Sequence, residues 1–139
     1  MNRWNAAVAG ALVLGLCATL VGQTPSTVKD GIYTDDQAKR GQAAYTDRCS
    51  ACHGDDLSGG GVAPALNGDT FSQSWVDRKL DELVSRIKDT MPADKPGSLT
   101  TEMNGDIVAY LLKSNGYTAG ERTLPTDPNE LQQITITKP

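Results

Sequence analysis

The chain has 139 residues, enough for one domain with a short leader. Its 17 acidic side chains outnumber its 13 basic ones, and the net charge of −4 argues against nucleic acid as a partner, because phosphates are bound through clustered Lys and Arg. Aromatic residues make up only 5% of the sequence. That supply is thin for a core of this size, and a large apolar prosthetic group would provide the missing buried area.

The first 22 residues have the layout of a secretory signal peptide. Arg3 is followed by an apolar run, residues 6–21, and then by small and polar residues. The run is shorter than the roughly 20 apolar residues that a membrane-spanning helix needs. We therefore expect cleavage near Gly22 and export, to the periplasm or otherwise out of the cytoplasm. The alternative is an uncleaved leader that anchors the protein to a membrane through residues 6–21.

The next segment, residues 23–33, is polar and is expected to be a flexible lead-in. Thr34 and Gln37 have the spacing of a capping box and predict a helix that begins after Thr34. One face of this helix repeats at steps of three and four residues, and it comprises Ala38, Gly41, Tyr45, Cys49 and Cys52. Gly41 is either a mildly destabilising accident or a point where a second helix comes close.

Residues 54–70 are rich in glycine and predict an irregular segment. The next helix is expected to begin after Ser74, because Asp77 stands at the third helical position. Its apolar stripe consists of Val76, Leu80, Leu83, Val84 and Ile87. Pro92 is expected to stop it just after Met91, since proline neither donates a backbone hydrogen bond nor tolerates a helical residue before it.

Two further helices are predicted towards the C-terminus. Thr100 is the expected N-cap of a helix that ends at residues 115–116, Asn-Gly. Asp127, followed by proline and then by an acid, predicts a short helix through about Gln133. Residues 134–136 are expected to be extended. The sequence contains no internal repeat and no convincing βαβ pattern.

The single histidine of the sequence and two of its three cysteines lie in the stretch Arg-Cys-Ser-Ala-Cys-His-Gly, residues 48–54. The third cysteine, Cys17, lies in the leader, where it is a small apolar residue or the acylated residue of a lipoprotein. A structural zinc site needs four ligands, a redox pair would follow a strand, and a cysteine nucleophile needs a separate histidine base. Cys49-x-x-Cys52-His53 instead fits covalent attachment of haem c, with two thioether bonds and one iron ligand.

One histidine leaves the second axial position of the iron to another residue. Methionine is the usual ligand there in electron carriers. Met91 is favoured because it lies where a helix ends, so that a loop could bring its sulfur to the iron; its other interpretation is core packing. Met103 falls in the first turn of the next helix, where packing is the better interpretation.

With these motifs the chain resembles a class I c-type cytochrome over about residues 35–116. The matching pieces are Gly41-Gln42-Ala43-Ala44-Tyr45, CSACHG at residues 49–54, Pro64-Ala65-Leu66, Thr90-Met91-Pro92 and Asp106-Ile107-Val108-Ala109-Tyr110-Leu111. The resemblance implies an all-α cytochrome c fold, with three core helices and a short C-terminal helix wrapped round one covalently attached haem. The first and last core helices would cross at Gly41. The cytochrome c domain would span residues 34–116, with a C-terminal extension over residues 117–139.

The resemblance also implies the surroundings of the haem. The carbonyl of Pro64 should accept a hydrogen bond from His53 Nδ1, which orients the ligand. The residues implied to line the pocket are Leu66, Leu83, Ile87 and Leu99. Phe71 and Trp75 would border the propionates or, equally, be ordinary core residues.

Function follows from the same features. A single-electron carrier with both axial positions filled is expected, with no catalytic residue and with redox proteins as partners. The tail is similar to that of small cytochromes that serve periplasmic quinoprotein dehydrogenases, which suggests such an enzyme as donor and a terminal oxidase or another cytochrome as acceptor. The alternative is a haem enzyme or sensor with an open or displaceable sixth position, against which the absence of a second histidine argues.

Overall fold

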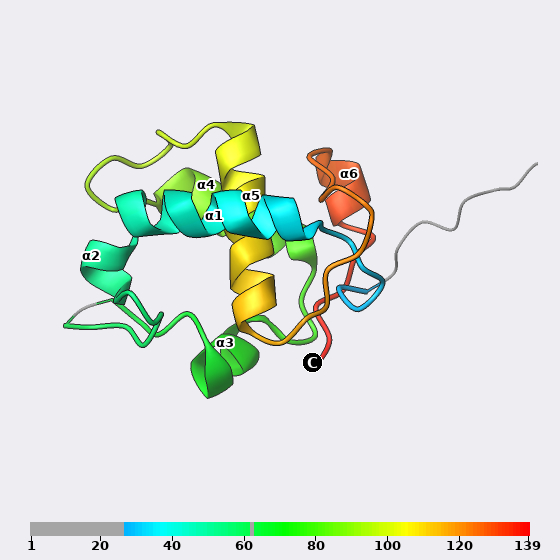
Figure 1. The fold of residues 1–139 in the computed structure, drawn as a ribbon, viewed down its shortest axis with the longest axis horizontal. Coiled ribbons are helices and arrows are strands. Elements are labelled where there is room, and N and C mark those ends of the chain that lie inside the picture. Colours follow the sequence, from blue (N-terminus) through cyan, green and yellow to red (C-terminus); the bar gives the residue numbers. More distant parts are fainter. Residues whose placement is uncertain (1–26, 62) are drawn as a thin grey trace, which may run out of the picture.

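The computed structural model describes residues 27–61 and 63–139 (Figure 1). Within this part the helices are α1 (Asp35–Arg48), α2 (Ser50–His53), α3 (Gly68–Trp75), α4 (Leu80–Thr90), α5 (Thr101–Ser114) and α6 (Pro128–Leu131). Over the same residues β-pairing is limited to isolated bridges, and no strand forms. The all-α class predicted from the sequence is confirmed. The predicted leader lies outside the described residues.

The capping box predicted for the first helix is present at the start of α1. Thr34 Oγ1 accepts a hydrogen bond from the Gln37 backbone N at 3.2 Å, and Gln37 Oε1 accepts one from the Thr34 backbone N at 3.3 Å. The two side chains thereby satisfy N–H groups that have no partner inside the helix. Gln37 Oε1 also accepts from Leu124 N at 2.9 Å, which ties this helix end to the C-terminal part of the chain.

α1 and α5 cross, as the resemblance implies (Figure 1). Gly41 is the point of closest approach. A Cβ on Gly41 would lie 1.8 Å from the carbonyl oxygen of Asp106 in α5, so only glycine allows this approach. Beside the crossing, the rings of Tyr45 and Tyr110 lie 5.3 Å apart, tilted by 51°. On the other side, Arg40 Nε and Asp106 Oδ2 form an ion pair at 2.8 Å. The two helices thus form a close-packed pair that supports the rest of the fold.

The expectation of a helix that begins after Ser74 is wrong. Ser74 lies inside α3, which starts at Gly68, within the segment 54–70 that was expected to be irregular. Asp77 then takes a positive φ of 68°, a conformation that interrupts a helix. The next helix, α4, begins only at Leu80. The predicted apolar stripe is confirmed for Leu80, Leu83 and Ile87, which are buried in α4. Val84 is only partly buried, and Val76 lies outside α4 as the C-cap of α3.

The lead-in before α1 is not flexible where the structure describes it. Val28, Ile32 and Tyr33 have no exposed surface, so this segment belongs to the core. Gly31 lies against Gly120 of the C-terminal part, where a Cβ on Gly120 would come within 2.4 Å of the Gly31 carbonyl oxygen. The prediction of a flexible lead-in is therefore wrong from residue 27 onward.

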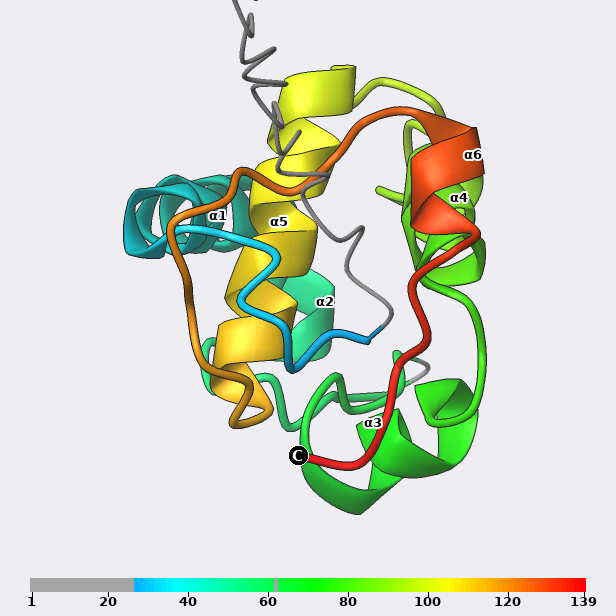
Figure 2. The same ribbon diagram turned by 90° about the vertical axis from the view of Figure 1, so that its right-hand side faces the viewer.

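The end of the chain runs between the lead-in and the α3–α4 connection (Figure 2). The Leu80 backbone N donates to the carbonyl of Ile134 at 2.9 Å. Ile136 N donates to the carbonyl of Arg78 at 2.9 Å, and its own carbonyl accepts from Asp77 N at 2.7 Å. These bonds hold the connection that carries one wall of the cavity described next.

No helix in residues 27–61 or 63–139 is both long enough and apolar enough to span a membrane.

Candidate haem site

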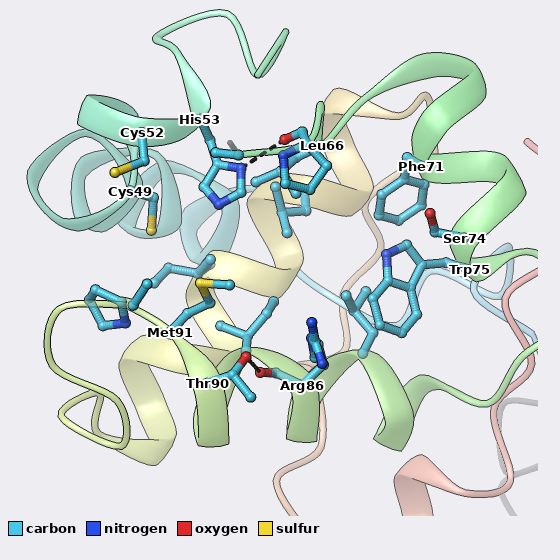
Figure 3. A pocket seen from close by; sticks show the side chains of 18 of the residues that line it. Cys49, Cys52, His53, Leu66, Phe71, Ser74, Trp75, Arg86, Thr90 and Met91 are labelled. Carbon is cyan, nitrogen blue, oxygen red and sulfur yellow. Dashed lines mark hydrogen bonds between the residues drawn. The ribbon is translucent and has the colours of Figure 1, made fainter. Parts of the chain in front are cut away.

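A cavity of about 1080 Å³ opens between the end of α1, α2, α3, α4 and α5 (Figure 3). Apolar side chains from α3, α4 and α5 line it, among them Phe71, Leu83, Ile87, Ile107 and Leu111. The volume lies at the upper end of what small-ligand sites reach, about 1,000 Å³, and suits a large prosthetic group.

The cavity brings together ten of the eleven residues expected at the site from the sequence. These are Cys49, Cys52, His53, Pro64, Leu66, Phe71, Trp75, Leu83, Ile87 and Met91. Leu99 is the exception, and the expectation that it lines the pocket is wrong. It lies just before the N-cap of α5 and is buried in the hydrophobic core, where its side chain packs against protein instead.

The imidazole of His53 is fixed by one hydrogen bond. Its Nδ1 lies 2.8 Å from the carbonyl oxygen of Pro64, the contact predicted from the resemblance. A carbonyl can only accept, so Nδ1 carries a proton, and in the neutral form of the ring the lone pair is on Nε2. Only 8% of His53 is exposed, and the ring faces the cavity in Figure 3. This orientation leaves Nε2 as the ring nitrogen that is available to bind a metal.

The two cysteines lie beside this ring on the same wall, and neither forms a disulfide (Figure 3). Burial raises the pKa of the Cys49 thiol to about 11, with a smaller contribution from nearby Cys52. At neutral pH the Cys49 sulfur of this chain is therefore a protonated thiol. Cys52 is exposed at the edge of the cavity.

The loop after α2 returns the chain to His53. The Gly59 N donates to the His53 carbonyl at 2.8 Å, and Gly59 has a positive φ of 77°. A Cβ on Gly59 would lie 2.6 Å from the Ala65 N, so glycine is required where the two arms of the loop meet. Tyr45 Oη, from α1, donates to the Gly54 carbonyl at 2.7 Å and so fixes the start of the loop to α1. The glycine run and the match at Pro64-Ala65-Leu66 were the signals for this loop in the sequence.

Met91 stands across the cavity from His53 (Figure 3). It is the C-cap of α4, and its backbone N donates to the Ile87 carbonyl at 2.9 Å, so its position is fixed by the end of the helix. The thioether is partly buried against the core. Met103 lies in the first turn of α5 and is not among the residues that line the cavity.

Besides Arg48, which precedes the cysteine motif, Arg78 and Arg86 line the cavity, and these two were not singled out from the sequence. The Arg78 guanidinium lies 5.2 Å from the Trp75 ring centroid, a cation–π distance, and pairs with Glu82. Arg86, from α4, extends between Trp75 and Thr90 in Figure 3. Cations at this side of the cavity suit a ligand with anionic groups. Arg78 lies in the α3–α4 connection and Arg86 lies on α4, and in the sequence neither differs from an ordinary exposed cation.

The donors present fit haem c better than a bare metal ion. Among the residues that the structure describes, no group of three or more His, Cys, Asp or Glu side chains could hold a metal. Two thiols, one imidazole with a free Nε2 and a thioether across an apolar cavity match the requirements of a covalently bound haem. Together, the helical fold and this Cys-x-x-Cys-His wall define a class I c-type cytochrome.

Comparison with known proteins supports the assignment to the c-type cytochromes. Residues 36–111, more than half of the chain, match the family described as "Cytochrome C oxidase, cbb3-type, subunit III". The chain belongs to this family of c-type cytochromes, which implies haem c and electron transfer.

One relative in sequence and one solved structure of similar fold illustrate its place among known proteins. The thiosulfate dehydrogenase of Stutzerimonas stutzeri (strain A1501) is 33% identical over 78 residues, 52% of this chain and 25% of that protein, so the chain spans only a quarter of its length. The crystal structure of the sulfane dehydrogenase SoxCD from Paracoccus pantotrophus is similar in fold, with a TM-score of 0.51 and 21% identity over 76% of this chain and 60% of that one.

Proposed function

We propose that the protein is a single-electron carrier with one haem c, bound through Cys49 and Cys52 and with His53 and Met91 as axial ligands. The observation that carries the proposal is the placement of an oriented imidazole and a thioether on facing walls of one cavity (Figure 3). When bound, the haem iron would cycle between Fe(II) and Fe(III). A methionine ligand favours the reduced state and raises the reduction potential.

The chain's own residues would bind and shield the group. The Pro64 carbonyl holds the His53 ring in one orientation and increases its strength as a ligand. Leu66, Leu83 and Ile87 line the walls and keep water away from the centre. The remaining lining residues with a proposed role are Phe71 and Trp75, which would border the propionates next to the arginines at the cavity. No side chain is required to act as an acid or a base.

We further propose export and redox partners outside the cytoplasm. Residues 1–22 would be the signal peptide, or an anchor if they are retained, residues 34–116 the cytochrome c domain and residues 117–139 its extension. Because the relative in sequence and the structure of similar fold named above are both described as dehydrogenases, an exported dehydrogenase is the proposed electron donor. A periplasmic quinoprotein dehydrogenase is one such enzyme, and a terminal oxidase or another cytochrome would be the acceptor.

A redox titration of the purified holoprotein tests the proposal. Optical spectra recorded against electrode potential should follow a single one-electron transition that is fully reversible. Haem should stay bound to the chain after denaturation, at one per chain, and should be lost from the denatured chain in the double variant Cys49→Ala/Cys52→Ala.

The same sample separates a carrier from a haem enzyme or sensor. In a carrier with both axial positions filled, the reduced protein should react slowly or not at all with carbon monoxide. Rapid formation of a carbon monoxide complex by the native reduced protein would show an exchangeable sixth position and would contradict the proposal.

A further inference from the structure

We infer that Asn115 is a positioning residue for the haem site: its side-chain amide holds the segment 66–68, and through it the Pro64 carbonyl that orients His53. The inference rests on the proposed function, since it concerns the ligand strength of His53. The sequence marked Asn115 only as the end of a helix.

Both ends of the Asn115 amide are used. Nδ2 donates to the Leu66 carbonyl at 3.0 Å and to the Leu111 carbonyl at 2.8 Å. Oδ1 accepts from the Gly68 backbone N at 3.0 Å. Only the bond to Leu111 belongs to the termination of α5. The other two reach a segment 47 and 49 positions earlier in the sequence and fasten it to the helix that packs on α1.

The held segment lies next to Pro64. Both backbone polar groups of Leu66 are hydrogen-bonded. Its N donates to the Leu57 carbonyl at 2.8 Å, and its carbonyl accepts from Asn115 Nδ2. Proline has no N–H, so Pro64 cannot donate a backbone hydrogen bond that would fix its position. The position of its carbonyl therefore depends on its neighbours, and Ala65 is the single residue between it and Leu66.

The bond from His53 Nδ1 to that carbonyl, 2.8 Å long, has a chemical consequence for the iron. A carbonyl that accepts from Nδ1 makes the imidazole more basic and a stronger donor through Nε2. A stronger donor stabilises the oxidised iron and lowers the reduction potential. Release of the segment 66–68 should lengthen or intermittently break this bond, and the potential should then rise.

The experiment compares Asn115→Ala with Thr100→Ala in the holoprotein. Thr100 caps the opposite end of α5, with its Oγ1 accepting from Met103 N at 3.1 Å, and it does not line the cavity. Loss of either cap should lower the stability of the fold. Only Asn115→Ala should raise the reduction potential. In the reduced protein it should also make the His53 Nδ1 proton exchange with water roughly tenfold faster, as seen by NMR, because the loop opens more often.

An unchanged or lower potential in Asn115→Ala, or an equal rise in Thr100→Ala, would overturn the inference. If Asn115→Ala does not accumulate, Asn115→Leu replaces it, since leucine keeps the branched shape and removes the same donor and acceptor. Failure of the proposed function is visible separately. In that case the wild-type ferric protein would lack the weak far-red band of a methionine sulfur–iron(III) bond, whatever the variants do.

Discussion

Gly41 is the residue at which the two longest helices of the described chain touch. A Cβ placed on it would lie 1.8 Å from the Asp106 carbonyl oxygen and 3.0 Å from Cβ of Tyr110. The nearer atom belongs to the backbone of α5, so it cannot move aside without displacing the helix. Gly105, in contrast, has room, because an added Cβ would meet only Leu124 Cδ2 at 3.8 Å.

These two glycines make a matched pair for mutation. Gly41→Ala should lower the free energy of unfolding by about 3 kcal/mol or more, because the α1–α5 contact must open. Gly105→Ala should leave it unchanged or raise it by about 0.5–1 kcal/mol, since alanine is the better helix former. Guanidinium unfolding followed by circular dichroism measures both. Equal stability of the two variants would argue against a close crossing at Gly41.

Residue-level predictions from the sequence succeeded where a single contact has a strong chemical requirement. Gly41 at the crossing and the bond from His53 to Pro64 are both confirmed. Asn115 could not be recognised, because its partners Leu66 and Gly68 are remote in sequence and are joined to it only by the fold. Nothing in the local pattern distinguishes its amide from that of an ordinary helix cap.

The C-terminal segment is the element that holds one wall of the cavity. It contacts the α3–α4 connection through backbone hydrogen bonds of Ile134 and Ile136, and it contacts the lead-in through a bond from Val28 N to the Thr135 carbonyl at 3.1 Å. The same segment contributes side chains to the core, since Ile134 is 1% exposed and Ile136 is 0% exposed.

Truncation of one of these side chains tests the role of the segment. Ile136→Ala should cost about 2–5 kcal/mol in the free energy of unfolding, the range for a large-to-small change at a buried isoleucine. The exposed neighbour Lys138, changed to alanine, should alter stability by no more than about 0.5 kcal/mol. Thermal or guanidinium melts give both values. If the C-terminal segment did not contribute to stability, the two variants would have the same free energy of unfolding.

Element boundaries in this region were predicted poorly for a physical reason. The residues Ser74-Trp75-Val76-Asp77 match a helix start, yet the chain ends α3 at Trp75 and turns through Asp77. The backbone N of Asp77 and that of Leu80 are satisfied by the C-terminal segment instead. That segment lies more than 50 residues later in the sequence, so the pattern of neighbouring residues could not predict these hydrogen bonds. The capping box of α1 depends only on neighbours and was predicted correctly.

Across the whole molecule, three tyrosine hydroxyls donate to backbone carbonyls of other segments. Tyr33 donates to the Tyr117 carbonyl, Tyr45 to the Gly54 carbonyl and Tyr117 to the Thr137 carbonyl. Burial raises the pKa of Tyr33 and of Tyr45 to about 12, with a smaller contribution from Asp35 at Tyr33 and from Cys49 at Tyr45. Burial also raises the pKa of Tyr117.

The shifts predict a loss of stability in alkaline solution. In the unfolded chain these phenols ionise near their ordinary pKa of 10, whereas in the folded chain Tyr33 and Tyr45 keep their protons until about 12. The unfolded state therefore binds fewer protons in this window, and the free energy of unfolding falls as the pH rises from 10 towards 12. Unfolding midpoints across the window measure the slope. Tyr33→Phe should flatten it, and a wild-type slope of zero would contradict the assignment.

The central claim is that His53 and Met91, on facing walls of the cavity, are the two axial ligands of the haem iron. The most direct measurement is the ferric optical spectrum of the holoprotein, in which a methionine sulfur–iron(III) bond gives a weak far-red band. The band should be present in the wild type, absent in Met91→Ala and unchanged in Met103→Ala, since Met103 does not line the cavity. A wild-type protein without the band, or a Met91→Ala variant that retains it, would contradict this ligation and the carrier function built on it.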